Sequence, residues 1–475
     1  LYDPDHLMGE MDEYGITCAL VPRETPGVEI GRRHFPINVP FQTGPIKGKD
    51  VFIPLDFIIG GPEMAGEGWK MLCEQLAVGR CISLPSNATG GAKAGIATTG
   101  AYARIRKQFH LPIGRFEGIE EVIARIASRA YTMEASRTMT SGAVDLGENP
   151  SVISAIAKYH MTEMGRMVAN DVLDVHGGKG IMLGPKNYLA RGYQAVPVTI
   201  TVEGANILTR SMIIFGQGAI RCHPYVLKEM ESAKADDLDA FDKALFGHIG
   251  YATSNAARAL VMAMTFARFT HVPVDGPTKR FYQHINRFSA AFALAADTAM
   301  LTLGGALKKK ESLSARLGDM LCLMYLSSAV LKRFEDQGRP AADLPVVEYA
   351  CRNLLYRLQE QMHGFLRNFP NRFVALGLRL LIFPRGRGYH APSDRLGHKV
   401  AQLMIAPTES RARLIDGIYD TLEPSNPIGL LEDLLHKAIQ MEPLEKRIRN
   451  AVKKGVIEER SIENQIDQAE EKEVL

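Results

Sequence analysis

Apolar side chains recur at spacings of three and four along two long stretches of this chain. Residues 119–139 and 151–176 each place their apolar positions on one face, with charged residues between them. This spacing predicts two long amphipathic helices. The second should stop at Gly177-Gly178, because a glycine pair is typical of a helix C-terminus. A further helix is expected to begin near Gly204, and long helices with short connections indicate a helical bundle.

The first sixty residues follow a different pattern, in which short apolar runs are broken by proline and glycine. Residues 15–22 form one such run, and the segments TPGVEIG and VFIPLDFIIGG follow it. These runs predict strands within residues 15–60. A short strand bracketed by Asp50 and Pro54 should end in a turn at Gly60-Gly61.

A second helical region is expected from about Tyr225 to the end of the chain. Its predicted breaks fall near residues 273–277, 338–345 and 384–392, where proline and glycine gather. The most apolar stretch, residues 289–307, contains Asp297 and two adjacent glycines, which favours a buried helix over a membrane span. The charged tail from Leu444 is helix-prone, which is typical of a solvated face and sometimes of a partner surface.

The composition is that of a globular protein with more than one domain. Of its 475 residues, 46% are hydrophobic and 23% are charged, and the net charge of +3 gives no indication of a nucleic-acid partner. Six cysteines lie far apart without a CxxC pair. We interpret them as reduced thiols in a cytoplasmic compartment. His160 and His176 lack a second ligand at helical spacing, so we predict no metal site.

The chain begins with LYDPDHLMGE, which has neither a basic nor an apolar segment of a signal peptide. This start is typical of the middle of a protein, and we expect the natural chain to continue upstream. Strands at the beginning would then leave open edges where upstream strands should pair.

Glu203 is the most informative single residue. In TVEGANILTR it stands between the β-branched run of residues 196–202 and a helix beginning near Gly204, at a predicted strand-to-helix junction. A carboxylate in such a setting is paired, exposed or used. The first N–H groups of a helix have no partner and can donate to a substrate oxygen, while the carboxylate removes a neighbouring proton. The alternative is a simple helix-capping acid.

Three other segments carry candidate chemistry. HGGKGI, residues 176–181, lets a backbone approach a phosphate, although a plain helix C-cap explains it as well. The basic cluster of Arg104, Arg106 and Lys107 suits a pyrophosphate or a solvated helix end. Arg80 lies on an apolar background, where it needs an acidic or carbonyl partner, and a structural salt bridge is the alternative.

In their order along the chain, these segments resemble the acyl-CoA dehydrogenase family. TPGVEIGRR and VFIPLDFIIGG look like the end of its central β domain, and GEGWKMLCEQLAVGR like the first helix of its C-terminal bundle. RIRKQF with FEGIEE, HGGKGI and VEGANILTR resemble its arginine-phenylalanine, Gly-Gly-x-Gly and catalytic Glu-Gly segments. FGQGAIRCHPYVLKEME resembles the extra domain of long bacterial members of the FadE type.

The resemblance implies a mainly α fold with a partial β domain. Residues 1–62 would be the C-terminal part of the central β domain and residues 63–222 the helical-bundle C-terminal domain. Residues 223–475 would be the extra all-helical domain of the bacterial type. The family's N-terminal helical domain has no counterpart in the chain. We therefore expect this piece alone to be largely helical, to bind FAD weakly and not to dehydrogenate acyl-CoA.

The resemblance also implies a catalytic role for Glu203. As the base, it would remove the pro-R α-proton of an acyl-CoA thioester while the β-hydride passes to N5 of FAD, giving trans-2-enoyl-CoA. The Glu203 N–H and a flavin hydroxyl would hold the thioester oxygen. Gly204 would let the substrate approach, and Arg80 matches the family's arginine beside the substrate.

Cofactor contacts are implied for ten residues. Some would hold the FAD pyrophosphate across a dimer interface, some would contact the adenosine end, and two would lie near the flavin. They are Arg106, Lys107 and Gln108; Phe116, Glu117, Asp174, Gly177 and Gly178; and Ala205 and Asn206. Ala205, Asp174, Glu117 and His110 depart from the residues common in the family, which are threonine, glutamine, glutamine and glycine.

The implied function is FAD-dependent dehydrogenation of medium- to long-chain acyl-CoA in fatty acid β-oxidation, with an electron-transferring flavoprotein as acceptor. A homo-oligomer is expected, in the cytoplasm, with attachment to the inner membrane through upstream sequence. Two alternatives stay open. One is an acyl-CoA oxidase-like flavoenzyme, and the other is a catalytically inactive helical scaffold.

Overall fold

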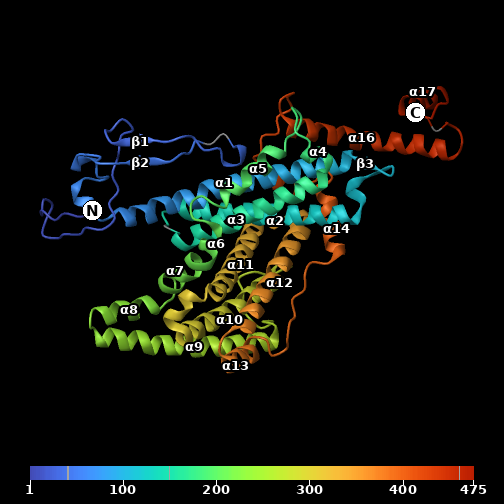
Figure 1. The fold of residues 1–475 in the computed structure, drawn as a ribbon. Coiled ribbons are helices and arrows are strands. Elements are labelled where there is room, and N and C mark those ends of the chain that lie inside the picture. Colours follow the sequence, from blue (N-terminus) through green and yellow to red (C-terminus); the bar gives the residue numbers. More distant parts are fainter. Residues whose placement is uncertain (40–41, 149, 459, 475) are drawn as a thin grey trace. The chain divides into compact units, whose positions relative to one another are not determined.

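A computed structural model shows a mainly helical protein with little β structure, as predicted (Figure 1). It describes residues 1–39, 42–148, 150–458 and 460–474. Contacts between residues divide the chain into two compact units. Unit 1 comprises Leu1–Ala92, Ser128–Asn170 and Leu189–Pro392, and unit 2 comprises Lys93–Ala127, Asp171–Tyr188 and Ser393–Leu475.

Unit 1 begins with a two-stranded ribbon in which β1 (Val28–Ile30) pairs antiparallel with β2 (Ile46–Gly48). The strands predicted at residues 15–22 and 50–54 are wrong. Within the described residues, the first makes only an isolated bridge from Ala19 to Ile58, and the second leads into a 3₁₀ turn. Two backbone hydrogen bonds, from Leu20 to Phe57 and from Ile59 to Cys18, join the first segment to residues 57–59, but this pairing is too short to form a strand. Proline also removes a donor from each segment. The turn at Gly60-Gly61 is confirmed by two positive φ angles.

Three long helices form the framework that carries the candidate site. They are α1 (Gly68–Ile105), α2 (Glu117–Asp145) and α3 (Ser151–His176), and each continues along the sequence from one unit into the other. The helices predicted over residues 119–139 and 151–176 are confirmed. The second ends where predicted, because Gly177 adopts a φ of 53° that a residue with a side chain rarely takes.

The predicted strand-to-helix junction is wrong in its first half. α5 (Ala190–Thr199) is a helix that includes most of the β-branched run and contains Pro197. The hydroxyls of Thr199 and Thr201 donate to the carbonyls of Val196 and Pro197 at 2.7 and 3.1 Å, within one turn of chain. Strand propensity reflects packing against neighbouring strands, and the described part of unit 1 has none beside this segment.

Helical structure resumes after Glu203, as predicted. α6 (Asn206–Leu208) leads into a π-helix at Thr209–Ile213 and then into α7 (Ile214–Arg221). A buried apolar cluster joins α7 to α3 and to a helix from further along the chain. Its members are Val152, Ala155 and Ile156 of α3, Ile214 of α7, and Cys322. This cluster fixes α3 beneath the segment that begins with Glu203.

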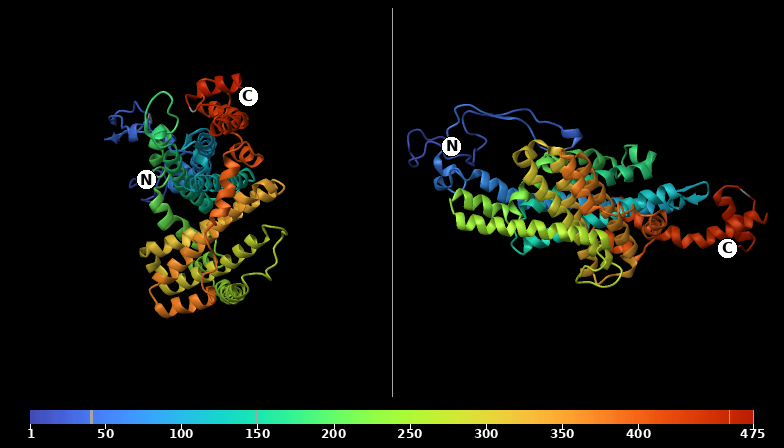
Figure 2. Two further views of the ribbon diagram at one scale, coloured as in Figure 1. Left: turned by 90° about the vertical axis from the view of Figure 1, so that its right-hand side faces the viewer. Right: turned by 90° about the horizontal axis from the view of Figure 1, so that it is seen from below.

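The rest of unit 1 is a layered helical domain in which consecutive helices pack on one another. α9 packs on α8 and α10, α11 lies between α10 and α12, and α13 contacts both α9 and α12 (Figures 1 and 2). The predicted breaks all fall at or between helix ends. The helices are α8 (Val226–Lys234), α9 (Leu238–Thr265), α10 (Lys279–Leu303), α11 (Glu311–Asp336), α12 (Leu344–Asn368) and α13 (Arg372–Ile382).

α10 is the helix expected from the most apolar stretch. Within the described residues, Lys279–Lys309 has the length and apolar composition that a membrane crossing requires. Most positions of α10 between Phe281 and Ala299 are nevertheless buried against α9 and α11, and they include Asp297. The helix ends at Gly304, one of the two glycines in that stretch. It therefore behaves as a helix of the protein core, as predicted.

Unit 2 combines the ends of α1 to α3 with a short hairpin and four C-terminal helices. In the hairpin, β3 (Lys107–Gln108) pairs with β4 (Leu111–Pro112). Arg411 is buried and ties the unit together, because its guanidinium donates to the Ala97 and Met404 carbonyls and pairs with Glu432. The remaining helices are α4 (Gly178–Ile181), α14 (Asp394–Met404), α15 (Glu409–Ile415), α16 (Pro427–Lys453) and α17 (Ile462–Glu471).

The cysteines form no disulfide among the described residues, and the two histidines of α3 lie inside the protein. Five cysteines are free thiols, whereas the side chain of Cys73 lies outside the part that the structure describes. His160 and His176 are both buried. Burial lowers the pKa of His176 to about 4, so this imidazole is neutral at physiological pH.

Candidate functional site

Glu203 and Gly204 form a strained turn between α5 and α6. Their φ angles are 54° and 94°, and the left-handed region is costly for a glutamate. Among the described residues, neither the Glu203 N–H nor the Gly204 N–H has a hydrogen-bond acceptor. The Glu203 side chain is exposed. The turn thus leaves one carboxylate and two backbone donors available to a bound molecule.

Gly204 cannot be replaced without disturbing this turn. A Cβ there would lie 3.3 Å from Thr209 Oγ1 and 3.9 Å from Arg80 Nη1, in addition to the strain of the positive φ. The Thr209 hydroxyl donates to the Gly204 carbonyl at 3.3 Å. Gly204 is therefore closely packed on the side that faces Thr209 and Arg80.

Lys158 supports the turn from below. Its side chain projects from α3 and is fully buried, with 0% of its surface exposed. Its ammonium Nζ donates to the Gly204 carbonyl and to Asn206 Oδ1, both at 2.7 Å. A buried lysine is rare unless it is paired, because an unpaired ammonium is costly to remove from water. The two hydrogen bonds of Lys158 therefore hold the turn against α3.

Asn206 completes this support rather than facing outward. Its amide nitrogen donates to Thr162 Oγ1 and to Glu163 Oε1, both at 2.9 Å, while its oxygen accepts from Lys158. The side chain is 4% exposed, and its carbonyl and both amide hydrogens are used within the chain. Its predicted place near a flavin stays a prediction.

The charge of Lys158 depends on its surroundings. Burial lowers its pKa to about 8, Glu203 and Glu163 act to raise it, and Arg80 acts to lower it further. These opposing effects show that the two carboxylates and the Arg80 guanidinium all lie within electrostatic reach of the amine. The site thus combines two cationic groups with the exposed carboxylate of Glu203.

Arg80 joins the same group from α1. Its Nη2 donates to the Ser154 hydroxyl of α3 at 3.2 Å. Because Nη1 lies 3.9 Å from the position of a Gly204 Cβ, the guanidinium borders the turn. The structure therefore brings together Arg80, Glu203 and Gly204, the three residues predicted for catalysis and substrate binding.

A π-helix follows the turn directly and is anchored by an ion pair. Thr209–Ile213 adopts this rare geometry, which often occurs at functional sites. Within it, Arg210 forms a two-pronged pair with Asp319 of α11, with Nη2 and Oδ2 2.6 Å apart. This bond holds the segment after Glu203 against α11 of the layered helical domain.

The predicted pyrophosphate cluster lies in unit 2, and its members differ in their bonding. Arg104 forms a forked pair with Glu442, and the ammonium of Lys107 pairs with Glu445 of the same helix. Arg106 is exposed and forms no ion pair with any described residue. Gln108 is exposed in the hairpin. Arg106 is therefore the cation best placed to accept an added anion.

The other predicted cofactor residues of unit 2 lie at helix ends. Phe116 directly precedes α2, Glu117 begins it, and Asp174 lies in the last turn of α3. Gly177 and Gly178 are exposed, and a Cβ on either would meet no atom within 4 Å. The Gly-Gly turn thus leaves open space beside its backbone, which suits close approach of a ligand. Ala205, in unit 1, precedes α6 and is exposed.

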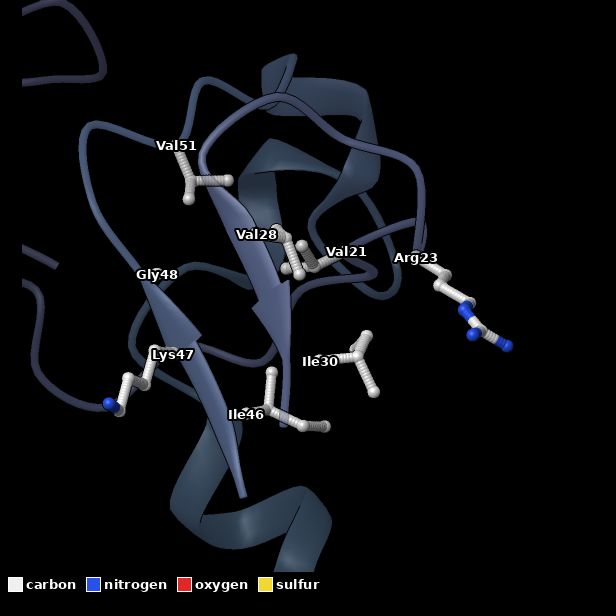
Figure 3. A pocket seen from close by; sticks show the side chains of 8 residues that line it. All are labelled: Val21, Arg23, Val28, Ile30, Ile46, Lys47, Gly48 and Val51. Atoms are coloured by element: carbon white, nitrogen blue, oxygen red, sulfur yellow. The ribbon is translucent and has the colours of Figure 1, made fainter. Parts of the chain in front are cut away.

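A pocket of about 540 Å³ lies elsewhere in unit 1, at the β ribbon (Figure 3). It is lined mainly by aliphatic side chains, and none of the residues predicted for catalysis or cofactor binding contributes to it. Its lining residues are Val21, Arg23, Val28, Ile30, Ile46, Lys47, Gly48 and Val51. The pocket therefore shares no residue and no secondary-structure element with the Glu203 turn.

Sequence reasoning missed Lys158, although a signal was present. Lys158 is a single cation in the run SAIAKYHM, on the apolar face of a predicted helix. The argument that singled out Arg80 and Glu203 applies equally to it. What the sequence did not contain was its partner, because the Gly204 carbonyl is 46 residues away.

Two family models match this chain. Residues 220–475 match the family model described as acyl-CoA dehydrogenase, C-terminal, bacterial type, and residues 66–216 match that of the acyl-CoA dehydrogenase C-terminal domain. This chain belongs to the acyl-CoA dehydrogenase family. The second match includes Arg80, Lys158 and the Glu203 turn, so the candidate site lies within a recognised domain of the family.

Two individual relatives differ in their names and in how much of this chain they cover. The probable acyl-CoA dehydrogenase FadE10 of Mycobacterium tuberculosis is 27% identical over 338 residues, covering 68% of this chain and 50% of that protein. Protein HemX of Proteus mirabilis is 64% identical over 101 residues, covering 21% of this chain and 59% of that protein. The chain spans about half the length of the curated relatives it matches.

The fold resembles that of a solved enzyme. An acyl-CoA dehydrogenase complexed with FAD from Bacillus anthracis aligns with a TM-score of 0.63 at 18% identity. The alignment covers 82% of this chain and 65% of that one. At this identity the likeness shows the fold, in agreement with the helical bundle and extra helical domain expected from the sequence.

Proposed function

We propose that the complete protein dehydrogenates acyl-CoA thioesters to trans-2-enoyl-CoA with FAD as cofactor. The observation that carries this proposal is the Glu203–Gly204 turn. It presents an exposed carboxylate and two backbone N–H groups without acceptors among the described residues, and it is held by a buried lysine. Membership of the acyl-CoA dehydrogenase family supports the same reaction.

Glu203 acts as the base in this proposal. Its carboxylate takes the α-proton of the thioester, and the electron pair of that C–H bond moves towards the carbonyl. The Glu203 N–H donates to the thioester oxygen and stabilises the negative charge that develops there. Gly204, which has no side chain, allows the thioester to come close to the backbone.

Lys158 has a positioning role in the same reaction. Its two hydrogen bonds hold the strained turn, so that the carboxylate and the N–H donors keep their relative places during proton removal. Asn206 transmits the restraint to α3 through Thr162 and Glu163.

The predicted cofactor residues of unit 2 have the charge and the open space that an anionic dinucleotide needs. Arg106 is a cation without a carboxylate partner among the described residues, and Gly177 and Gly178 border open space. We propose that Arg106 and Gln108 hold the pyrophosphate, and that Phe116, Glu117 and the Gly177–Gly178 turn contact the adenosine end. When bound, FAD supplies the acceptor for the hydride that leaves the β-carbon.

The remaining assignments are also proposals. We expect medium- to long-chain substrates, a place in fatty acid β-oxidation, and an electron-transferring flavoprotein as electron acceptor. We expect a homo-oligomer in the cytoplasm, with attachment at the inner membrane.

The experiment is spectroscopic and uses the complete protein. It should purify with flavin absorbance that acyl-CoA bleaches without oxygen, and the bleached enzyme should then reduce an electron-transferring flavoprotein. Formation of hydrogen peroxide in air at the same rate as bleaching would instead indicate an oxidase. Absence of flavin, or flavin that acyl-CoA does not bleach, would indicate the inactive scaffold.

A further inference from the structure

The outer side of α13 carries an apolar stripe that nothing in the described chain covers. Phe373, Leu376 and Leu380 recur at spacings of three and four, and Phe373 is 88% exposed. The opposite side of the helix packs inward through Ala375, Leu378 and Ile382. α13 is therefore apolar on both sides, although only one side contributes to the core.

α9 carries a second stripe of the same kind. Leu260, Val261 and Met264 are exposed near its C-terminal end, whereas Met262 and Ala263 between them are buried. Exposed apolar residues at one helix face mark a contact surface rather than scattered surface positions.

The two stripes lie on neighbouring helices. α13 packs directly against α9, while α10 and α12 lie on the inner side of this pair (Figures 1 and 2). Arg385, just after α13, donates to the Met264 carbonyl at 3.0 Å and joins the two helix ends. We call the six residues Leu260, Val261, Met264, Phe373, Leu376 and Leu380 the α9–α13 face.

The two segments that carry this face are basic, and one of their arginines, Arg387, pairs with the neighbouring Glu360. Residues 243–274 and 361–393, which contain both stripes, include no aspartate or glutamate and seven arginines. Arg372 and Arg379 lie seven residues apart on α13, beside its stripe. Neither they nor Arg268 form an ion pair with any described residue.

We propose that the α9–α13 face docks the protein onto an anionic phospholipid membrane. Large apolar side chains at a helix surface, bordered by arginines, are suited to insertion at the headgroup boundary with the cations against lipid phosphates. A second copy of the chain fits less well, because pairing this face with itself would bring two sets of unneutralised arginines together. Protruding side chains on helices also match a deformable bilayer better than a protein pocket.

This inference is independent of the dehydrogenase proposal, because none of the residues involved belongs to the candidate site. The test measures co-sedimentation of the 475-residue chain with phospholipid vesicles, which needs no cofactor or substrate. Vesicles containing about one-third phosphatidylglycerol should bind the chain, and pure phosphatidylcholine vesicles should bind it weakly. Raising the salt concentration should release much of the bound protein, because salt screens the arginine–phosphate attraction.

Two double variants separate the apolar and the charged contributions. Phe373→Ser with Leu376→Ser, and Arg372→Glu with Arg379→Glu, should each weaken vesicle binding by about tenfold or more. Leu146→Ser is the apolar control, because Leu146 is 86% exposed at the end of α2. Arg32→Glu with Arg33→Glu is the charge control in the β ribbon. Both controls should bind vesicles like the parent, and circular dichroism checks that every variant is folded.

Three results would overturn the proposal. The first is no binding to anionic vesicles by the folded parent chain. The second is binding that the face variants and the controls alter equally. The third is a dimer in sedimentation velocity that Phe373→Ser with Leu376→Ser dissociates, which would make the face an interface between copies of the chain.

Discussion

Two clusters of charged side chains lie between helices of unit 1. They differ in how many of their polar groups have hydrogen-bond partners within the chain. At the Glu203 turn, the backbone is strained, the carboxylate is exposed, and two N–H groups have no acceptor among the described residues. At the second cluster, His223, His248 and Asp297, the groups mostly satisfy one another. Polar groups without hydrogen-bond partners at a strained turn are available to bind or react with a ligand. Polar groups that bond to one another stabilise the packing of the helices instead.

The hydrogen bonds of the second cluster also decide its proton positions. His223 Nδ1 accepts from the N–H groups of Tyr225 and Val226, so its proton lies on Nε2 and is donated to Asp297 at 3.0 Å. His248 Nδ1 lies 2.8 Å from a Glu229 oxygen and donates to it. Asp297 Oδ2 is a buried oxygen without a partner among the described residues.

This arrangement bears on metal binding. The three residues lie close enough to surround an ion. A metal needs a ring nitrogen with a free lone pair, and in His223 one nitrogen is protonated while the other accepts two backbone donors. We therefore interpret the cluster as a hydrogen-bonded brace that joins the start of α8 to α9 and α10.

The largest effect is expected when the exposed carboxylate of the Glu203 turn is removed. Glu203→Gln in the complete protein should lower dehydrogenation by about 10²–10⁴-fold, because the amide cannot take a proton. FAD and acyl-CoA binding should persist, since the shape is unchanged. Asp297→Asn is the matched control and should leave turnover near that of the parent. Near-normal turnover of Glu203→Gln in stopped-flow measurements would place the base elsewhere.

The same contrast is repeated in unit 2 between two neighbouring cations. Arg106→Ala should raise the FAD dissociation constant about ten- to a hundredfold, because charge-assisted bonds to a pyrophosphate are lost. Lys107→Ala should have a smaller effect, since Lys107 is already paired with Glu445. Equilibrium titration of flavin fluorescence measures both. Equal dissociation constants for the parent and Arg106→Ala, with unchanged helicity, would contradict this assignment.

Lys158 tests whether the turn depends on its buried support. Lys158→Met should lower the free energy of unfolding by about 1–3 kcal/mol, because two buried acceptors lose their donor. The difference should depend on pH. The folded pKa of Lys158, about 8, is below its ordinary value of 10.5, so the folded state releases this proton first. The stability that Lys158 contributes therefore rises between about pH 8 and pH 10.5 and is lost as the pH falls back through 8.

Urea unfolding of the parent and of Lys158→Met at several pH values measures this effect. Val168→Ala, a core change on the same helix without an ionisable group, provides the control and should show a pH-independent difference from the parent. A parallel pH dependence in the parent and in Lys158→Met would show that the amine titrates normally.

The smallest expected effect concerns the brace. Zn²⁺ added at neutral pH should leave the melting temperature unchanged, because a ligand stabilises a fold only when it binds the native state. His223→Ala should lower the free energy of unfolding by about 1 kcal/mol through loss of a side-chain cap at the start of α8. A Zn²⁺-dependent rise in melting temperature that His223→Ala abolishes would make the cluster a metal site.

The chemistry of the candidate site was predictable in part. Glu203 and Arg80 were singled out because a charge on an apolar background needs a reason, and the structure places both at one turn. Lys158 meets the same criterion, but its meaning depends on the Gly204 carbonyl and on Asn206. Contacts between residues more than forty positions apart leave no periodic trace in a single sequence.

The sequence by itself determined the elements whose causes are local. The period of apolar residues sets α2 and α3, and glycine sets the end of α3 and the turn at Gly204, because these depend on spacing and on allowed φ angles. Only the tertiary structure decided that residues 196–199 are helical and that Asp50 to Pro54 forms no strand. A strand is stabilised by the strands beside it, so its existence depends on partners that local propensity does not specify.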